Sequence, residues 1–179
     1  MNLANKLTMT RIALIPLFMI CVLIDIPNGN IIATALFVLA AVTDFLDGYI
    51  ARKRKQITNL GKLLDPLADK LLVSAGLVVL LETGDINSWI AILIIGREFL
   101  VTGLRGVAAA EGIVIAASKE AKVKTVIQII AISLLLIEPL PTEILGFSPG
   151  IWALYVAVAF TVYTGYDYLV KTFAKINMS

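Results

Sequence analysis

Four closely spaced aspartates are the residues of this sequence best suited to chemistry. Asp44 and Asp47 stand three positions apart, and Asp65 and Asp69 stand four apart, so on helices the members of each pair share one face. The segment between the pairs is short, and the two helices would be antiparallel neighbours that bring four carboxylates to one depth. Clustered carboxylates repel one another unless protons or cations compensate.

Carboxylate oxygens favour hard cations, so the cluster predicts bound Mg²⁺ first, with Mn²⁺ or Ca²⁺ as alternatives. Four such ligands suffice for two ions, an arrangement suited to clamping a pyrophosphate. Small residues nearby would let a nucleotide approach the backbone, and Arg52 can bind a phosphate with two parallel hydrogen bonds; the small residues are Gly48, Ala51 and Gly61. The alternative is that the aspartates only cap helices or pair with Arg52 and Lys70.

These residues form a recognisable run, Asp-x2-Asp-Gly-x2-Ala-Arg-x8-Gly-x3-Asp-x3-Asp, between Asp44 and Asp69. It resembles the signature of the CDP-alcohol phosphotransferase family at all eight fixed positions. The resemblance implies a six-helix membrane fold, usually dimeric, with CDP-diacylglycerol entering from the bilayer. It further implies two metal ions, Mg²⁺ or Mn²⁺, held by Asp44, Asp47, Asp65 and Asp69, with Asp69 also the base.

A second set of polar residues precedes the first apolar run. Asn5, Thr8 and Arg11 recur at every third position, on one face of an entering helix, and resemble the segment that lines the nucleotide site in this family. The implied CDP-binding set is therefore Asn5, Thr8, Arg11, Gly48, Ala51, Arg52 and Gly61. The alternative for the first three is an interfacial helix with ordinary caps and an arginine that reaches the headgroups.

Basic residues of the later helices indicate an acceptor that carries its own phosphate. They are Arg97, Arg105, Lys122 and Lys124. The surrounding stretches resemble the phosphatidylglycerophosphate synthase branch of the family, which implies sn-glycerol 3-phosphate as acceptor and CMP as the second product. Inositol phosphate, inositol or serine remain alternative acceptors. The other interpretation is that Arg97 pairs with Glu98 or Glu111 and that the lysines only follow charge topology.

The residue inventory favours direct displacement over a covalent intermediate. The chain has no histidine and a single cysteine, Cys21, which lies inside the first apolar run. Triads of the Ser-His-Asp type, thiolate zinc sites and histidine acid/base chemistry are thereby excluded or nearly so. The nucleophiles of the cluster are carboxylates committed to metal, so the acceptor hydroxyl should attack the lipid-bearing phosphate itself.

The elements that position these residues are expected to be membrane helices. The chain is 59% hydrophobic over 179 residues, above the roughly 45–50% of soluble domains. Six runs approach the ~20 residues that span a bilayer: about Thr10–Ile24, Ile31–Ile50, Leu63–Leu81, Trp89–Leu104, Val123–Ile137 and Ile151–Val170. The prediction is one all-α membrane domain, residues 1–179, with six transmembrane helices and a short N-terminal interfacial helix.

The charge pattern predicts the orientation of these helices. Basic residues cluster before the first run, between the second and third, between the fourth and fifth, and after the sixth, whereas the opposite loops contain acidic residues but no Lys or Arg. Both termini and the active site should therefore be cytoplasmic, in the cell membrane. Lys70 and Arg97 fall inside runs, where a charge calls for a partner or a function. Gly96, Gly103 and Gly106 are expected to serve close helix packing.

Two other classes of protein are alternatives for the aspartate cluster. Intramembrane prenyltransferases also bind Mg²⁺ and a diphosphate, but they leave Gly48, Ala51, Arg52 and Gly61 without a reason to match. A divalent-cation transporter predicts acidic residues at mid-membrane, where the runs have almost no ionisable groups. The expected partners are CDP-diacylglycerol, sn-glycerol 3-phosphate, the lipid bilayer and a second copy of the chain, and no nucleic acid.

Overall fold

The structure is a computed structural model. It describes the backbone of residues 3–24, 26–54, 59–110, 112, 119–138 and 140–176. Side chains are described over the same ranges except at 3, 4, 44–54, 59–63, 65, 110, 119 and 173–176.

Six long helices and one short helix make up the described part of the chain, which contains no strand. They are α1 (Leu3–Leu23), α2 (Gly29–Arg54), α3 (Asn59–Glu82), α4 (Ser88–Ala110), α5 (Lys119–Leu136), α6 (Leu140–Leu145) and α7 (Pro149–Ile176). The all-α class expected from the sequence is confirmed for these residues.

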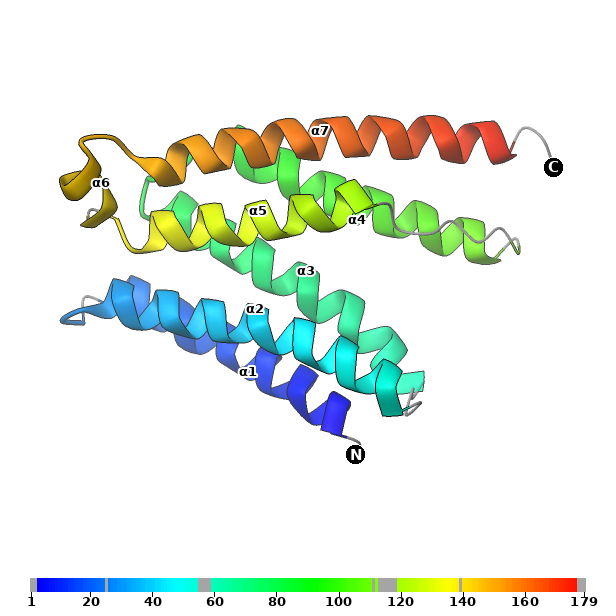
Figure 1. The fold of residues 1–179 in the computed structure, drawn as a ribbon, viewed down its shortest axis with the longest axis horizontal. Coiled ribbons are helices and arrows are strands. Elements are labelled where there is room, and N and C mark those ends of the chain that lie inside the picture. Colours follow the sequence, from blue (N-terminus) through cyan, green and yellow to red (C-terminus); the bar gives the residue numbers. More distant parts are fainter. Residues whose placement is uncertain are drawn as a thin grey trace.

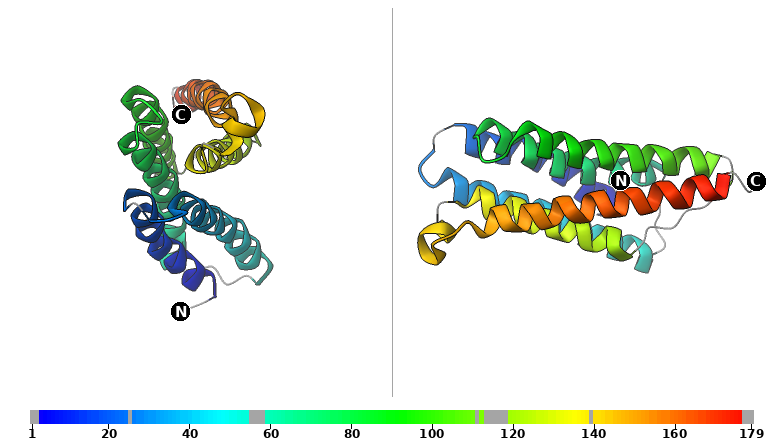
Figure 2. Two further views of the ribbon diagram at one scale, coloured as in Figure 1. Left: turned by 90° about the vertical axis from the view of Figure 1, so that its left-hand side faces the viewer. Right: turned by 90° about the horizontal axis from the view of Figure 1, so that it is seen from above.

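The helices run back and forth along one long axis, so that successive connections alternate between the two ends of the bundle (Figure 1). Helix α1 packs along α2, and α5 packs along α7. Helix α3 lies between these two pairs and contacts α1, α2, α4 and α5, as the end-on view of Figure 2 also shows. The start of α1, the end of α2, the start of α3 and the end of α7 lie toward the same end of the bundle, opposite α6 (Figure 1).

The core forms where α1, α2, α3 and α5 meet. Phe18 and Phe37 are fully buried, and their rings meet edge to face with centroids 5.5 Å apart. Leu77 and Ile132 are 1% exposed and join the same cluster. The apolar interior therefore occupies the middle of the bundle, while the aspartate motif lies at one end of it.

Close approach of α3 to α2 and α5 depends on Gly76. A Cβ atom there would lie 2.9 Å from Cγ2 of Ile132 and 3.0 Å from Cε2 of Phe37. The glycines expected to pack closely, Gly96, Gly103 and Gly106 on α4, have nothing within 4 Å of an added Cβ in the described structure. The expectation for these three glycines is therefore not met within this chain.

Each of the six apolar runs lies mainly within one long helix, but two expectations about the elements change. The N-terminal interfacial segment is not separate, because residues 3–23 form the single helix α1 and nothing between Asn5 and Thr10 interrupts it. The short helix α6 was not expected. By length and apolarity, two helices qualify as membrane spans in the described chain, at Asn5–Leu23 and Pro149–Thr172.

Candidate active site

The aspartate motif occupies the facing ends of two consecutive helices. Asp44 and Asp47 belong to the last turns of α2, and Asp65 and Asp69 belong to the first half of α3. Gly48, Ala51 and Arg52 follow on α2, and Gly61 stands near the start of α3. The two expected helices are thus present, whereas the side chains of all these residues except Asp69 lie outside the described structure.

Asp69 is the one aspartate of the motif whose side chain the structure describes. Its side chain is 28% exposed, and its Oδ2 accepts a hydrogen bond from Nζ of Lys70 at 2.9 Å. Among the described residues no group of three carboxylate, thiol or imidazole side chains could hold a metal ion. The motif as a whole still offers only carboxylate oxygens, the donors that hard divalent cations prefer.

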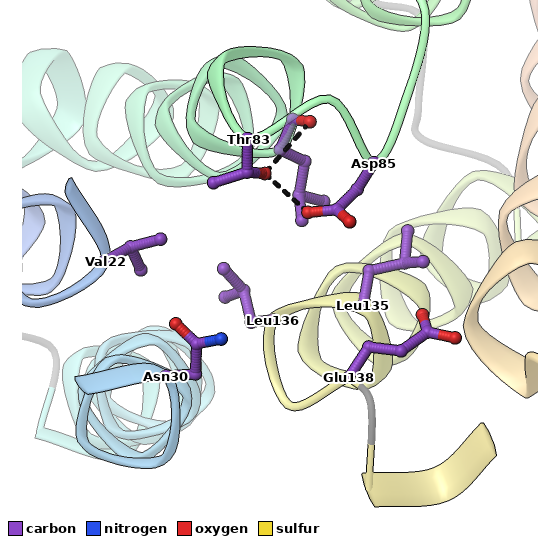
Figure 3. Close-up of a pocket in the computed structure, with 8 residues that line it drawn as sticks. Val22, Asn30, Thr83, Asp85, Leu135, Leu136 and Glu138 are labelled. Carbon is purple, nitrogen blue, oxygen red and sulfur yellow. Dashed lines mark hydrogen bonds between the residues drawn. The ribbon is translucent and has the colours of Figure 1, made fainter. Parts of the chain in front are cut away.

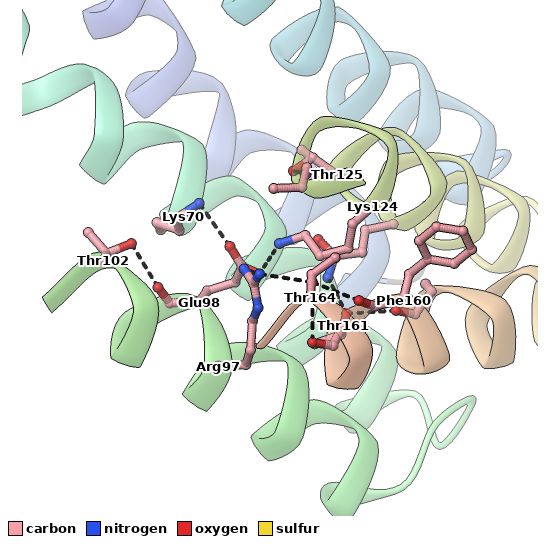
Figure 4. A network of polar contacts seen from close by, with 12 residues as sticks. Lys70, Arg97, Glu98, Thr102, Lys124, Thr125, Phe160, Thr161 and Thr164 are labelled. Carbon is pink, nitrogen blue, oxygen red and sulfur yellow. Dashed lines mark hydrogen bonds and ion pairs between the residues drawn. The ribbon is translucent and has the colours of Figure 1, made fainter. Parts of the chain in front are cut away.

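A buried cluster of charges begins at Lys70 and extends across three helices (Figure 4). Nζ of Lys70 lies 2.9 Å from Oε2 of Glu98 on α4. The other carboxylate oxygen, Oε1, accepts a hydrogen bond from Nη1 of Arg97 at 3.1 Å. Nζ of Lys124 on α5 also contacts Oε1. Glu98 is 5% exposed and Lys124 only 1%, so these charges depend on one another rather than on water.

A layer of hydroxyl and amide groups connects this cluster to α7. Nη2 of Arg97 donates to Oγ1 of Thr164 at 2.9 Å. One turn away, Nε2 of Gln128 donates to Oγ1 of Thr161 at 3.1 Å. A Cβ at residue 165 would lie 3.1 Å from Cγ of Arg97, so Gly165 makes room for the arginine stem. The polar groups of α4, α5 and α7 are thus held in one defined arrangement.

The four predicted acceptor residues divide into two groups. Arg97 and Lys124 lie in the buried cluster, and the contact of Arg97 with Glu98, which the sequence offered as an alternative, is present. Arg105 and Lys122 are exposed, on the last turns of α4 and the first turn of α5. Arg105 lies near the end of α4 and Lys122 and Lys124 near the start of α5, whereas Arg97 lies near the middle of α4. Their role toward an acceptor stays a prediction.

The N-terminal polar face packs against the helix that carries the first two aspartates. Asn5 is 6% exposed, and Thr8 and Arg11 are fully buried. Nε of Arg11 donates to the backbone carbonyl of Ala40 at 3.2 Å, one turn before Asp44. The structure therefore brings this face to the motif end of α2, while its role in nucleotide binding stays a prediction.

Sequence reasoning gave no site role to Glu98, Gln128 or Thr164, and for Lys70 it expected a function or a partner, with the aspartates as alternative partners. Glu98 and Lys70 could have been singled out from the sequence, since each is an ionisable residue inside an apolar run and needs a partner there. Glu98 was considered only as a partner of Arg97, because its contacts with Lys70 and Lys124 connect helices that are distant in the sequence. Gln128 and Thr164 gave no signal apart from being polar within apolar helices.

A separate pocket lies at the opposite end of the bundle (Figure 3). Its volume is about 200 Å³, and it is lined by Val22, Asn30, Leu80, Thr83, Asp85, Leu135, Leu136 and Glu138. These residues belong to the last turns of α1, α3 and α5, the first turn of α2 and the adjoining turns. The pocket is therefore remote from the aspartate motif.

Comparison with known proteins identifies the class to which this helical scaffold and its motif belong. The family model for CDP-alcohol phosphatidyltransferase matches residues 1–163. The chain belongs to the CDP-alcohol phosphatidyltransferase family and is an enzyme of that family.

Individual relatives cover nearly the whole chain. A Bacillus subtilis (strain 168) protein named CDP-diacylglycerol–glycerol-3-phosphate 3-phosphatidyltransferase is 47% identical over 99% of this chain and 98% of its own. A Rickettsia bellii protein of the same name is 42% identical over 93% of each chain. A Mycobacterium tuberculosis protein named probable phosphatidylglycerophosphate synthase is 35% identical over 98% of this chain and 84% of its own.

Family membership excludes the two alternative classes of protein that the aspartate cluster left open. Neither an intramembrane prenyltransferase nor a cation transporter accounts for a family match that extends from residue 1 to residue 163. The resemblance drawn from the aspartate run is confirmed.

Proposed function

We propose that this enzyme transfers the phosphatidyl group of CDP-diacylglycerol to sn-glycerol 3-phosphate, giving phosphatidylglycerophosphate and CMP. The observation that carries the proposal is the 47% identity, over 99% of the chain, with a protein named for this reaction. The excess of cations at buried Lys124 and partly buried Lys70 and Arg97 agrees with an acceptor that is itself a phosphate ester.

The aspartate motif is the proposed site of metal and CDP. Asp44, Asp47, Asp65 and Asp69 would hold two divalent ions, Mg²⁺ or Mn²⁺, because their donors are all carboxylate oxygens. Bound there, the ions would neutralise charge on the pyrophosphate. Arg52, Asn5, Thr8 and Arg11, with the small residues Gly48, Ala51 and Gly61, form the proposed surroundings of the cytidine diphosphate.

The acceptor phosphate is assigned to the basic residues of α4 and α5. Arg97 and Lys124 provide the buried part of this site, and Arg105 and Lys122 provide its exposed entrance. In the described structure Nε of Arg97 is buried without a hydrogen-bond partner, so the guanidinium keeps a donor for an additional oxygen. A guanidinium binds phosphate through several N–H groups at once.

The proposed reaction is a single displacement. The acceptor hydroxyl oxygen forms a bond to the lipid-bearing phosphorus, the bond from that phosphorus to the bridging oxygen breaks, and CMP leaves with the electron pair. Asp69 accepts the hydroxyl proton, because its carboxylate lies at the junction of the motif and the cation cluster. No residue of the chain becomes covalently attached to the lipid.

The protein is proposed to act in the cell membrane as one domain, residues 1–179, with six spans and both termini in the cytoplasm. The helices alternate in direction, and the turns opposite the motif end lack Lys and Arg, which agrees with this orientation. Trp89 and Trp152 are 81% and 65% exposed, as expected of anchors at a membrane interface. A homodimer is proposed from the family resemblance alone.

A choice among acceptors tests the proposed function. Purified protein in detergent is given CDP-diacylglycerol with labelled sn-glycerol 3-phosphate, inositol phosphate, inositol or serine in separate reactions. We expect labelled lipid and stoichiometric CMP with glycerol 3-phosphate and little with the others. Lipid product with another acceptor, and none with glycerol 3-phosphate, would refute the substrate assignment but not the family.

Metal removal gives a separate prediction. The pyrophosphate and four carboxylates cannot share a poorly hydrated site without cations, so excess EDTA should abolish CMP release. Addition of Mg²⁺ or Mn²⁺ beyond the chelator should restore it. Full turnover after metal removal, verified by elemental analysis, would show that the carboxylates act without metal.

A further inference from the structure

We propose that Glu98 is a positioning residue of the transfer reaction, and this inference rests on the proposed function. One oxygen of its carboxylate holds Lys70 beside Asp69, and the other holds Lys124 and Arg97. Glu98 would thereby fix the cations for the acceptor phosphate relative to the group that accepts the hydroxyl proton.

The division of contacts between the two oxygens is the first observation. Oε2 faces Lys70 at 2.9 Å, and the same ammonium group lies 2.9 Å from Oδ2 of Asp69. Oε1 faces Nη1 of Arg97 at 3.1 Å and also contacts Nζ of Lys124. A single carboxylate therefore connects α3 of the aspartate motif to the basic residues of α4 and α5, as Figure 4 shows.

The balance of charge is the second observation. Among the described side chains, three cations and two carboxylates, Glu98 and Asp69, meet in this cluster, which leaves one positive charge in excess within that set. A purely structural ion pair needs one cation for one carboxylate. The excess is suited to an anionic acceptor, provided that the cations do not disperse by mutual repulsion.

Burial determines what the loss of Glu98 would do. Lys124 is 1% exposed and Glu98 is 5% exposed, so the lysine cannot replace this partner with water at its present position. An uncompensated buried charge is costly, and the flexible lysine stem would carry the ammonium group away. The acceptor site would then lose its geometry even where the rest of the bundle stays folded.

The test is Glu98→Gln, which preserves the shape but replaces one acceptor oxygen with an amide that cannot accept from an ammonium group. In the purified enzyme we expect the KM for sn-glycerol 3-phosphate to rise about tenfold or more, while the KM for CDP-diacylglycerol changes less than about threefold. Glu98→Asp keeps the charge at a shorter reach and should recover part of the acceptor affinity. Asp167→Asn, which alters an exposed pair with Lys171 on α7, should leave both constants unchanged.

A charge-matched double variant separates positioning from simple charge balance. Glu98→Gln combined with Lys70→Gln removes one negative and one positive charge, so the net charge of the described cluster is unchanged while the bridge to Asp69 is lost. We expect its acceptor KM to stay raised. Wild-type kinetics in the double variant, or an acceptor KM that is unchanged or lowered in Glu98→Gln, would overturn the inference. Wild-type enzyme that makes no lipid from glycerol 3-phosphate would instead refute the proposed function.

Discussion

Asp69 has two proposed tasks, since its carboxylate would contact a cation and also accept a proton. The structure already places Lys70 at 2.9 Å from one of its oxygens. The ammonium group can orient the carboxylate without occupying both oxygens. A substitution that keeps the size of the side chain but removes its charge therefore tests the chemical task most directly.

For Asp69→Asn we expect kcat to fall roughly 10²–10⁴-fold, the usual contribution of a positioned base. CDP-diacylglycerol should still bind, because the proposed site retains Arg52 and three aspartates. Rapid-quench measurement of CMP release, together with nucleotide binding, separates the two effects. Asp167→Asn is the matched control, because Asp167 forms an exposed i,i+4 pair with Lys171. A near-normal kcat in Asp69→Asn would remove Asp69 from the role of base.

The exposed basic residues provide a second prediction at this scale. Arg105→Ala and Lys122→Ala should each raise the KM for sn-glycerol 3-phosphate about tenfold and leave the KM for CDP-diacylglycerol nearly unchanged. Lys171→Ala, also exposed but on α7, is the control for a general loss of positive charge. If instead the lipid substrate alone is affected, these residues belong to the other half of the site.

The aspartate pairs could be predicted from the sequence because the arrangement of each pair depends only on spacing within one helix. The spacing of Asp44, Asp47, Asp65 and Asp69 places each pair on one helical face whatever the tertiary fold. Glu98 is different, because its partners Lys70 and Lys124 lie on other helices. Which cation meets which carboxylate depends on the rotation of each helix about its axis, which spacing along a single helix does not determine.

Helix α3 is the element on which the bundle depends. It contacts α1, α2, α4 and α5, and it carries Asp65, Asp69 and Lys70 at one end. Its close approach at Gly76 could not be distinguished in the sequence from the glycines of α4, since a small residue permits close packing but does not require it. The short helix α6 was missed because six residues leave too little periodicity to detect.

Gly76→Ala should destabilise the protein by about 1–3 kcal/mol, because the new methyl group would overlap Ile132 and Phe37 in a close-packed core. Gly103→Ala is the matched control on α4, where an added Cβ meets nothing within 4 Å. Alanine also favours helix over glycine by about 1 kcal/mol, so the control should be neutral or stabilising. Thermal unfolding in one detergent measures both, and equal midpoints would argue against close packing at Gly76.

At the scale of the whole molecule, the distribution of Lys and Arg follows the alternating direction of the helices. The helix ends near the aspartate motif are the start of α1, the end of α4, the start of α5 and the end of α7 (Figure 1). Lys and Arg are frequent in the sequence near these helix ends, whereas the turns at the other end lack both. Within the described residues, α2, α3, α4 and α5 do not qualify as membrane spans by length and apolarity, and α3 and α4 carry charges of the cluster around Glu98. Lys70, Arg97 and Lys124 pair with carboxylates inside the bundle, and helices whose charges are paired in this way can still cross a bilayer.

Labelling of introduced cysteines tests whether α4 crosses the membrane. In a Cys21→Ser background, Glu82→Cys places a thiol before α4 and Glu120→Cys places one after it, and both positions are exposed. Lys171→Cys near the end of α7 marks the side that is proposed to be cytoplasmic. If six helices span the bilayer, a membrane-impermeant maleimide should label residue 82 only from outside intact cells, and residues 120 and 171 only in inverted vesicles. If α1 and α7 alone cross, residues 82 and 120 share one side, and equal labelling of both would contradict the six-span arrangement.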